Sequence, residues 1–282
     1  MAFGAGAPVT AARPTNNLAG GRNLLLWTVG AVTAFLLLFW LITLALRLPF
    51  WPDAITKNAG LFVNGARTTL YLTVISGVLG LVTGVLLGLG KLSALKFIAW
   101  PCSFVIWIIR GTPLYIQLLF ANYALPAIIP PFGNLVNWAN TWPNFDAAGI
   151  FITAVLALSL NVAAYNAEVI RGGVLGVPRG QAEAARSLGL SGRQTLTQVV
   201  LPQALRLSLP ALINNIVALL KDSSLAAVIA VSELALISAQ VASSSFQPVP
   251  VLTVTAAVYL ALTTVLTLFT DQLERRLKVG ER

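Results

Sequence analysis

Residues 180–189 of the chain are Gly180-Gln181-Ala182-Glu183-Ala184-Ala185-Arg186-Ser187-Leu188-Gly189, and after nine intervening residues comes Val199-Val200-Leu201-Pro202. The first of these segments is polar and is flanked by arginines, yet it lies between two of the most apolar segments of the sequence. A segment of such soluble character, placed there, indicates a polar projection between two membrane spans.

Local signals predict a short helix of about three turns from Arg179 to Leu188. Pro178 stands where a helix can start, and Gly189 stands where a helix can end in a left-handed residue. The three alanines of this stretch keep the helix slim enough to enter a cleft on another protein, while Glu183 and the flanking arginines supply polar contacts. The same composition also fits an ordinary loop that folds back on its own bundle.

The composition is that of an integral membrane protein, because 57% of the 282 residues are hydrophobic and only 10% are charged. The single cysteine, Cys102, allows no internal disulfide, and the sequence offers no cluster of histidine or cysteine for a metal. The net charge of +9 comes from short basic clusters between apolar stretches, which is typical of a membrane topology signal. Nucleic acid is therefore excluded as a partner.

Apolar segments predict an all-α membrane protein with six transmembrane helices. The first, Leu24–Leu46, has 23 residues without a charge and follows a tail, residues 1–23, that we expect to be disordered. A cleaved signal peptide is the alternative, but the apolar run is too long and lacks a small-residue cleavage site. The other predicted spans are 68–90, 97–125, 147–167, 194–220 and 251–270.

The connections between these spans carry further predictions. The proline-rich segment 122–146 is predicted to be an external loop, and the region around Glu233 a short re-entrant or packing helix. The last uncharged run of the fifth span, Leu207–Leu220, has only 14 residues, so we expect its helix to begin at the Leu201-Pro202 bend. In the second span, Gly77, Gly80 and Gly84 permit close helix packing or simply reflect membrane composition.

The distribution of lysine and arginine predicts that both termini are cytoplasmic. With that orientation twelve of the eighteen basic residues lie inside, including the arginines around the quoted segment. They are Arg13, Arg22, Lys91, Lys96, Arg171, Arg179, Arg186, Arg193, Arg275, Arg276, Lys278 and Arg282.

Polar residues within the spans should face the bundle or a wet cavity, because a cation at membrane depth costs about 2.5–3.5 kcal/mol on insertion scales. Arg110 is such a cation, and Pro113 close to it predicts a kink. Asn161, Tyr165 and Glu168 are spaced by four and three residues and so share one helix face.

The quoted segment resembles the signature loop of the membrane subunits of ABC importers. The matching positions are Glu183, Ala184, Ala185, Gly189, Val199, Leu201 and Pro202, with Val199 where isoleucine is commoner. The resemblance implies that residues 172–194, Gly180 included, form a cytoplasmic coupling loop whose helix enters the ATPase subunit.

Further stretches resemble one branch of these permeases, the importers of polar amino acids related to the histidine, glutamate, glutamine, arginine and opine systems. They are Asn64-Gly65-Ala66-Arg67-Thr68-Thr69-Leu70, Arg110-Gly111-Thr112-Pro113-Leu114 with Gln117, Ala163-Ala164-Tyr165-Asn166-Ala167-Glu168 before Arg171-Gly172-Gly173, and Lys221-Asp222-Ser223-Ser224-Leu225. The resemblance spans residues 64–278 and implies a five-helix type I importer core, to which residues 24–46 add an N-terminal helix.

An amino acid zwitterion crossing at mid-membrane needs acceptors for its ammonium group and donors for its carboxylate. The candidate acceptors are Asp222 and Glu168; the candidate donors are Arg110, Lys221, Thr73, Ser223 and Ser224; Asn161, Tyr165 and Gln117 are candidates for side-chain specificity, and Thr112 lies on the same predicted pathway. The alternative is that Lys221 with Asp222, and Arg110 with a helix end or Glu168, are packing pairs that never touch substrate.

The resemblance also implies the partners. No Gly-x-x-x-x-Gly-Lys-Ser/Thr sequence is present, so ATP and Mg²⁺ are expected on a separate ATPase rather than on this chain. Two ATPase subunits, a second permease subunit (identical or paralogous) and an external solute-binding protein complete the expected complex in a bacterial inner membrane. An ion-coupled secondary amino acid transporter is the alternative function, although no internal duplication supports it, and a non-transporting scaffold would not need buried charges.

Overall fold

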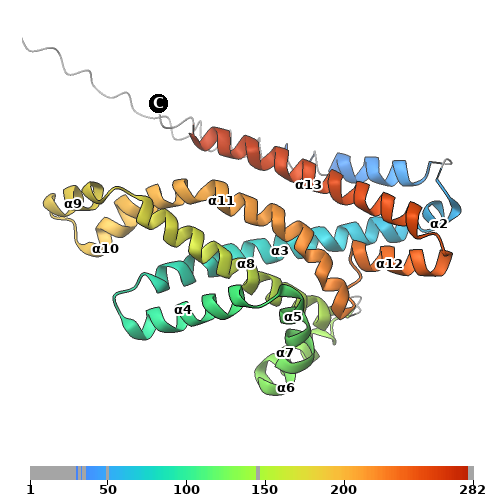
Figure 1. Cartoon of the computed structure of the whole chain (residues 1–282), viewed down its shortest axis with the longest axis horizontal. Coiled ribbons are helices and arrows are strands. Elements are labelled where there is room, and N and C mark those ends of the chain that lie inside the picture. Colours follow the sequence, from blue (N-terminus) through green and yellow to red (C-terminus); the bar gives the residue numbers. More distant parts are fainter. Residues whose placement is uncertain (1–29, 31–32, 34–35, 49–50, 144–146, 279–282) are drawn as a thin grey trace, which may run out of the picture.

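The structure is a computed structural model that describes residues 30, 33, 36–48, 51–143 and 147–278, with the side chains of 273–278 excepted. Every regular element in this part of the chain is a helix (Figure 1). In chain order they are the short helix Leu36–Leu46, α2 (Asp53–Thr56), α3 (Ala59–Lys91), α4 (Lys96–Gly111), α5 (Leu114–Leu119), the π-helix η1 (Phe120–Ala124), α6 (Leu125–Ile128), α7 (Pro130–Ala139), α8 (Ala148–Gly176), α9 (Arg179–Ser187), α10 (Gly192–Gln194), the π-helix η2 (Thr195–Val200), α11 (Leu201–Asp222), the 3₁₀-helix η3 (Ser223–Ile229), α12 (Leu234–Ser245) and α13 (Pro248–Lys278).

The predicted helical membrane architecture is confirmed at the level of four to five spans. α3, α8, the stretch Gly192–Ile229 and α13 are each long and apolar enough to cross a membrane, and the bent pair of α4 with α5–α6 makes a fifth candidate. The described part of the predicted 24–46 span holds the 11-residue apolar helix Leu36–Leu46. The rest of that span and the predicted tail 1–23 lie outside the described residues.

Two spans are longer than the uncharged runs that predicted them. α3 begins at Ala59 rather than Thr68, because Phe62 and Ala66 are fully buried while Arg67 stays exposed on the other face. Burial of one face extends a helix beyond the point where the sequence becomes polar. α8 likewise continues to Gly176 rather than ending near residue 167.

The fifth span is also continuous, so the predicted start at the Leu201-Pro202 bend is wrong. The helical stretch begins at Gly192, where Ser191 and Gln194 form a reciprocal capping box. Six π-helical residues, Thr195–Val200, then precede Pro202. Pro202 lies within this continuous stretch, directly after η2, so its missing N–H removes one intrahelical bond to the preceding turn.

The predicted kink beside Arg110 is confirmed, and it is a sharp break. α4 ends at Gly111, Thr112 and Pro113 are extended, and the helices on the two sides are bent by 111°. The predicted external loop 122–146 is wrong for its first part, since residues up to Ala139 form η1, α6 and α7. Residues 144–146 lie outside the described residues.

The centre of the bundle is the contact between α3 and α8, which we call the α3–α8 seam. It is formed by Gly80, Gly84 and Gly88 of α3 against Val162–Ala167 of α8, and all three glycines are buried. A Cβ atom built on Gly84 would lie 2.6 Å from the Asn166 Cβ and 3.0 Å from the Ala163 carbonyl oxygen. The glycines therefore permit close helix packing, as the sequence suggested for Gly80 and Gly84.

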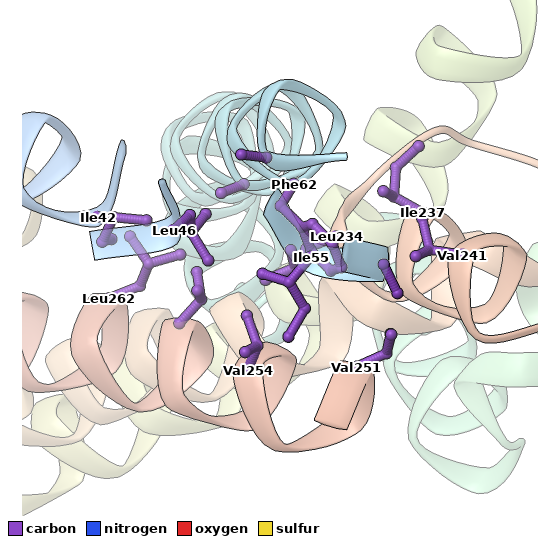
Figure 2. Close-up of a cluster of buried hydrophobic side chains, with 14 of the residues drawn as sticks. Ile42, Leu46, Ile55, Phe62, Leu234, Ile237, Val241, Val251, Val254 and Leu262 are labelled. Carbon is purple, nitrogen blue, oxygen red and sulfur yellow. The ribbon is translucent and has the colours of Figure 1, made fainter. Parts of the chain in front are cut away.

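A second core joins the short helix Leu36–Leu46 to α3, α12 and α13 (Figure 2). Ile42 and Leu46 of the short first helix lie in the same buried cluster as Phe62 of α3 and Leu262 of α13. The predicted packing helix is α12, and Glu233 caps it by accepting hydrogen bonds from the backbone of Ala235 and Leu236, both at 2.8 Å. The Tyr259 hydroxyl donates a third bond at 2.7 Å, which satisfies a fully buried carboxylate.

Candidate functional site

The connection between α8 and α11, which we call the α9 segment (residues 177–191), lies at one end of the bundle, opposite α2 and α12 (Figure 1). Its helix runs from Arg179 to Ser187, with Pro178 as the N-cap residue, and Gly189 has φ of +86°. The local signals in the sequence therefore predicted this helix and its left-handed end correctly.

Only one residue of α9, Ala185, is buried. Ala182 packs on the small apolar cluster of Val177, Val200 and Ala204, which fixes the helix to the start of α11. Gly180, Glu183 and Ala184 face outward, and Leu188 beside them is 84% exposed. Leu201 and Pro202 are the two remaining residues predicted to take part in the coupling loop. Leu201 is half-buried and Pro202 is exposed, and both lie in the first turn of α11.

A cavity of about 370 Å³ opens where α5, α8 and α11 meet. Four of the predicted pathway residues line it, together with Asn215 and six less polar residues. The full lining is Thr112, Pro113, Leu114, Asn161, Val162, Tyr165, Asn215, Ala218, Leu219, Asp222 and Leu225. The break after α4 supplies Thr112, α8 supplies Asn161 and Tyr165, and the end of α11 supplies Asp222.

Gln117 is not a cavity-lining residue, but its hydrogen bonds hold the lining residues Thr112 and Asn161 in place. Its Nε2 donates to the Ile109 carbonyl at 2.7 Å and to the Thr112 hydroxyl at 2.9 Å, so it covers backbone freed by the bend. Its Oε1 accepts a hydrogen bond from the Nδ2 of Asn161 at 2.9 Å. One of the two amide N–H groups of Asn161 is therefore engaged, and its other N–H and its Oδ1 remain for a ligand in the cavity.

Asn215 is a cavity residue that the sequence reasoning missed. Its Nδ2 donates to the Oδ1 of Asn166 at 2.9 Å, and the buried Asn166 in turn donates to the Gly80 carbonyl at 3.3 Å. The chain of amides ties the cavity wall to the α3–α8 seam. An asparagine pair, Asn214-Asn215, inside an otherwise apolar span was the available signal.

Arg110 is exposed, and its guanidinium lies over the ring of Tyr165, 5.4 Å from the ring centroid. This distance is within the range of a cation–π interaction. The Arg110 guanidinium therefore lies next to the cavity wall, against Tyr165, and does not form an ion pair with Glu168.

Glu168 shares its helix with Asn161 and Tyr165 but is not among the cavity-lining residues. Its carboxylate forms ion pairs with Lys91 at the end of α3 and with Arg171, whose Nε is 2.9 Å away. The side chains of Lys91, Glu168 and Arg171 are 29%, 16% and 35% exposed, so water still reaches this ion-pair cluster.

The other predicted pathway residues are not among those that line the cavity. Thr73 is buried and donates to the Thr69 carbonyl at 2.8 Å. The hydroxyls of Ser223 and Ser224 donate to the carbonyls of Leu220 and Lys221, at 2.8 and 2.6 Å. Lys221 and Asp222 are exposed and form no ion pair within the part of the chain that the structure describes.

Comparison with known proteins gives consistent matches over most of the chain. Residues 80–279 match the family described as binding-protein-dependent transport system inner membrane component. The arginine transport system permease protein ArgU of Corynebacterium glutamicum is 34% identical over 262 residues, covering 90% of this chain and 80% of that protein. The glutamine transport system permease protein GlnP of Escherichia coli is 36% identical over 231 residues, covering 80% and 97%.

Solved structures agree with the fold. A crystal structure of an amino acid ABC transporter with histidines superposes with a TM-score of 0.67 at 34% identity, covering 78% of this chain and 95% of that one. The inward-facing MetNI methionine ABC transporter gives a TM-score of 0.59 at 22% identity, covering 77% and 96%, which shows the fold alone. Because of these matches, we conclude that the chain belongs to the family of binding-protein-dependent transport system inner membrane components.

Proposed function

We propose that this chain is the transmembrane permease subunit of an ATP-driven importer that moves a polar amino acid into the cytoplasm. The observation that carries the proposal is the connectivity of the α9 segment. It joins α8 to α11, and these two helices hold Asn161, Tyr165, Asn215 and Asp222 of the cavity wall. A force applied to α9 is therefore transmitted directly to two walls of the same cavity.

The mechanism follows from this connection. Two ATPase subunits, which bind ATP and Mg²⁺, engage the exposed face of α9 through Gly180, Glu183 and Ala184 on this chain and on a second permease subunit. Their closure moves α8 and α11 as rigid bodies and exposes the cavity alternately to the two sides of the membrane. An external solute-binding protein delivers the amino acid, and both termini and the α9 segment lie on the cytoplasmic side of a bacterial inner membrane.

The cavity offers chemistry suited to an amino acid. Asp222 is the carboxylate in its wall, and the side-chain amide oxygens of Asn161 and Asn215 are two further acceptors. These three groups receive the substrate's ammonium group. Arg110, beside Tyr165, and the Lys221 ammonium are the charges that attract its carboxylate, while Glu168 is held by Lys91 and Arg171.

The proposal is tested by reconstituting the permease in lipid vesicles with and without its ATPase and measuring amino acid uptake. We expect uptake only with both ATPase and ATP. Glu183→Arg should lower that uptake by about tenfold or more, since it reverses a charge at a contact with the ATPase, while insertion in the membrane is unchanged.

A matched control is Asp53→Arg, which makes the same change of charge at an exposed side chain of α2, at the opposite end of the bundle (Figure 1). This variant should transport normally, because its ion pair with Lys57 is exposed and contributes little. Uptake driven by an ion gradient without ATPase would replace the proposal with a secondary transporter. Equal uptake by both variants would remove the coupling role of α9.

A further inference from the structure

The segment between α4 and α8 carries no charge over a long distance. From Gly111 to Phe145 there are 35 residues without Asp, Glu, Lys or Arg. The α9 segment and its flanks, by contrast, hold Arg171, Arg179, Arg186 and Arg193 within 23 residues. A connection that lay in water outside the membrane would be expected to contain charged residues, so the α5–α7 hairpin (residues 114–139) calls for a different environment.

The length of α4 places the start of this hairpin inside the membrane. α4 begins at Lys96, close in sequence to Lys91 at the end of α3, and two lysines mark the membrane surface at that end. Its 16 residues rise about 24 Å, which is less than the roughly 30 Å thickness of the hydrocarbon layer. The 111° bend that follows then turns α5 away while it is still within the far leaflet.

Hydrogen bonds and a close helix contact cover backbone groups beside the bend, at the start of α8 and between α6 and α7. Gln117 bonds to the Ile109 carbonyl freed by the bend. At the far side, the Asn140 side chain accepts the Gly149 N–H at 2.9 Å at the start of α8. A Cβ on Gly133 of α7 would lie 2.8 Å from the Pro126 carbonyl oxygen, so α6 and α7 are in direct contact. Helices with such covered ends can lie in a lipid environment.

The exposed surface of the hairpin continues the apolar surface of α4. On α4 the residues Phe97, Trp100, Phe104 and Trp107 are between 59% and 76% exposed and are spaced as one helix face. The same kind of surface follows on the hairpin, with Phe120, Tyr123, Ile128 and Trp138 between 51% and 68% exposed. Exposed aromatic and aliphatic side chains are therefore found on both sides of the bend, on α4 and on the hairpin as far as α7.

α7 combines apolar and polar groups in the manner of an interfacial helix. Trp138 makes an edge-to-face contact with Trp142, with ring centroids 5.0 Å apart and an interplanar angle of 89°. Asn134, Asn137 and Asn140 are exposed beside them. Indole rings next to uncharged amides are typical of the zone where lipid headgroups meet the acyl chains.

We propose that the α5–α7 hairpin lies in the interfacial layer of the bilayer leaflet remote from α9, with Trp138 and Trp142 among the lipid headgroups. The occupant of its exposed face is lipid rather than a soluble partner protein. The aromatic and aliphatic groups contact the upper acyl chains, and the asparagines of α7 contact the headgroups. In this position the hairpin anchors the break at Thr112 and Pro113, which forms one side of the cavity.

Tryptophan fluorescence tests the proposal on the full chain in phosphatidylcholine vesicles. One variant keeps only Trp138 and Trp142, with the other tryptophans changed to phenylalanine. A matched variant keeps only Trp107, which is 69% exposed on α4. We expect a loss of Trp138 and Trp142 emission with lipid brominated near the headgroup, a smaller loss with lipid brominated deep in the chains, and protection from aqueous iodide. Trp107 should show the reverse order of the two bromolipids.

Strong quenching by iodide with none by bromolipid would place the hairpin in water and overturn the proposal. Protection from both quenchers would also overturn it, because the face would then be covered by protein. A second measurement avoids the multiple replacements: with Cys102→Ser and Asn137→Cys, a nitroxide at residue 137 should be more accessible to oxygen, which concentrates in lipid, than to a water-soluble nickel complex. The opposite order would contradict the proposal.

Discussion

The α3–α8 seam and the α9 segment both depend on small residues, but they use them in opposite ways. In the seam, a Cβ atom added to Gly80, Gly84 or Gly88 would come within 2.1 to 2.7 Å of atoms on α8. At Gly180 and Gly189 of the α9 segment, an added Cβ would meet nothing within 4 Å. Small residues bring two backbones together in the seam, whereas around α9 they leave a narrow, accessible helix.

This difference distinguishes residues that stabilise the helix bundle from residues that are accessible to a partner protein. Helix association inside a membrane draws mainly on close packing and interhelical hydrogen bonds, and the seam provides both through its glycines and the bond from Asn166 to the Gly80 carbonyl. The α9 segment has one buried residue in its helix and contributes little to packing. Changes in the seam should therefore affect assembly, and changes in the α9 segment should affect local order and coupling.

The largest effect is expected for Gly84→Leu in the seam. The new side chain would overlap both the Asn166 Cβ and the Ala163 backbone, which cannot move aside without separating the helices. We expect a loss of more than about 3 kcal/mol of stability, the upper range for overpacking. Size-exclusion chromatography in detergent should show aggregated protein and little monodisperse protein.

The control for this variant is Gly77→Ala on the same helix. Its Cβ would lie 3.6 Å from Leu219 Cδ2, an ordinary contact distance. Gly77→Ala should elute like the unmodified protein. If Gly84→Leu did so as well, the close contact of α3 and α8 would not be needed for assembly.

Sequence reasoning predicted α9 nearly residue by residue because its limits are set locally. Pro178 and Gly189 act through their own backbone restrictions, which do not depend on the rest of the fold. Proline, however, misled the prediction for 122–146. Pro126, Pro130 and Pro131 suggested a loop. Pro130 and Pro131 in fact stand in the first turn of α7, where proline is well tolerated, and Pro126 follows η1 within a continuous helical stretch.

The cavity could be predicted only in part, because spacing identifies a helix face and not a position along it. Asn161 and Tyr165 share a face with Glu168, but Glu168 lies seven residues beyond Asn161, about 10 Å further along α8. That distance takes it from the cavity to Lys91 and Arg171. Asn215 was missed because its importance depends on Asn166 and Gly80, which are brought to it only by the packing of three helices.

A smaller effect is expected for Gly189→Ala, which acts on the α9 segment alone. A residue with a Cβ in the left-handed region is strained by about 1–2 kcal/mol, although no atom obstructs it. Hydrogen exchange at the amides of α9 should therefore accelerate by roughly fivefold to thirtyfold, while exchange in α3 and α8 is unchanged.

Gly192→Ala is the matched control for this measurement. It too has open space around an added Cβ, but its φ is not positive, so exchange in α9 should be unaltered. Equal exchange in the two variants would mean that the left-handed turn at Gly189 does not hold the end of α9.

The smallest effect is expected for Lys91→Ala, where the α3–α8 seam ends in the ion-pair cluster. Glu168 keeps its pair with Arg171, and the cluster is partly exposed, so the loss of stability should be about 1 kcal/mol or less. The melting temperature should fall slightly in low salt and approach that of the unmodified protein in high salt, which screens the remaining charges. Lys96→Ala, at a lysine without an ion pair in the described part of the chain, is the matched control.

The same variant distinguishes the two roles considered for Glu168. If its carboxylate is a structural partner of Lys91 and Arg171, then Lys91→Ala should leave ATP-driven uptake close to normal. Asp222→Asn, which alters the cavity wall itself, should reduce uptake strongly in the same assay. A strong reduction by Lys91→Ala, with unchanged melting temperature, would instead indicate that Glu168 contacts the substrate. The cavity would then have to extend along α8 toward the α9 segment during transport, because about two turns of α8 separate Glu168 from the cavity-lining Asn161 in this structure.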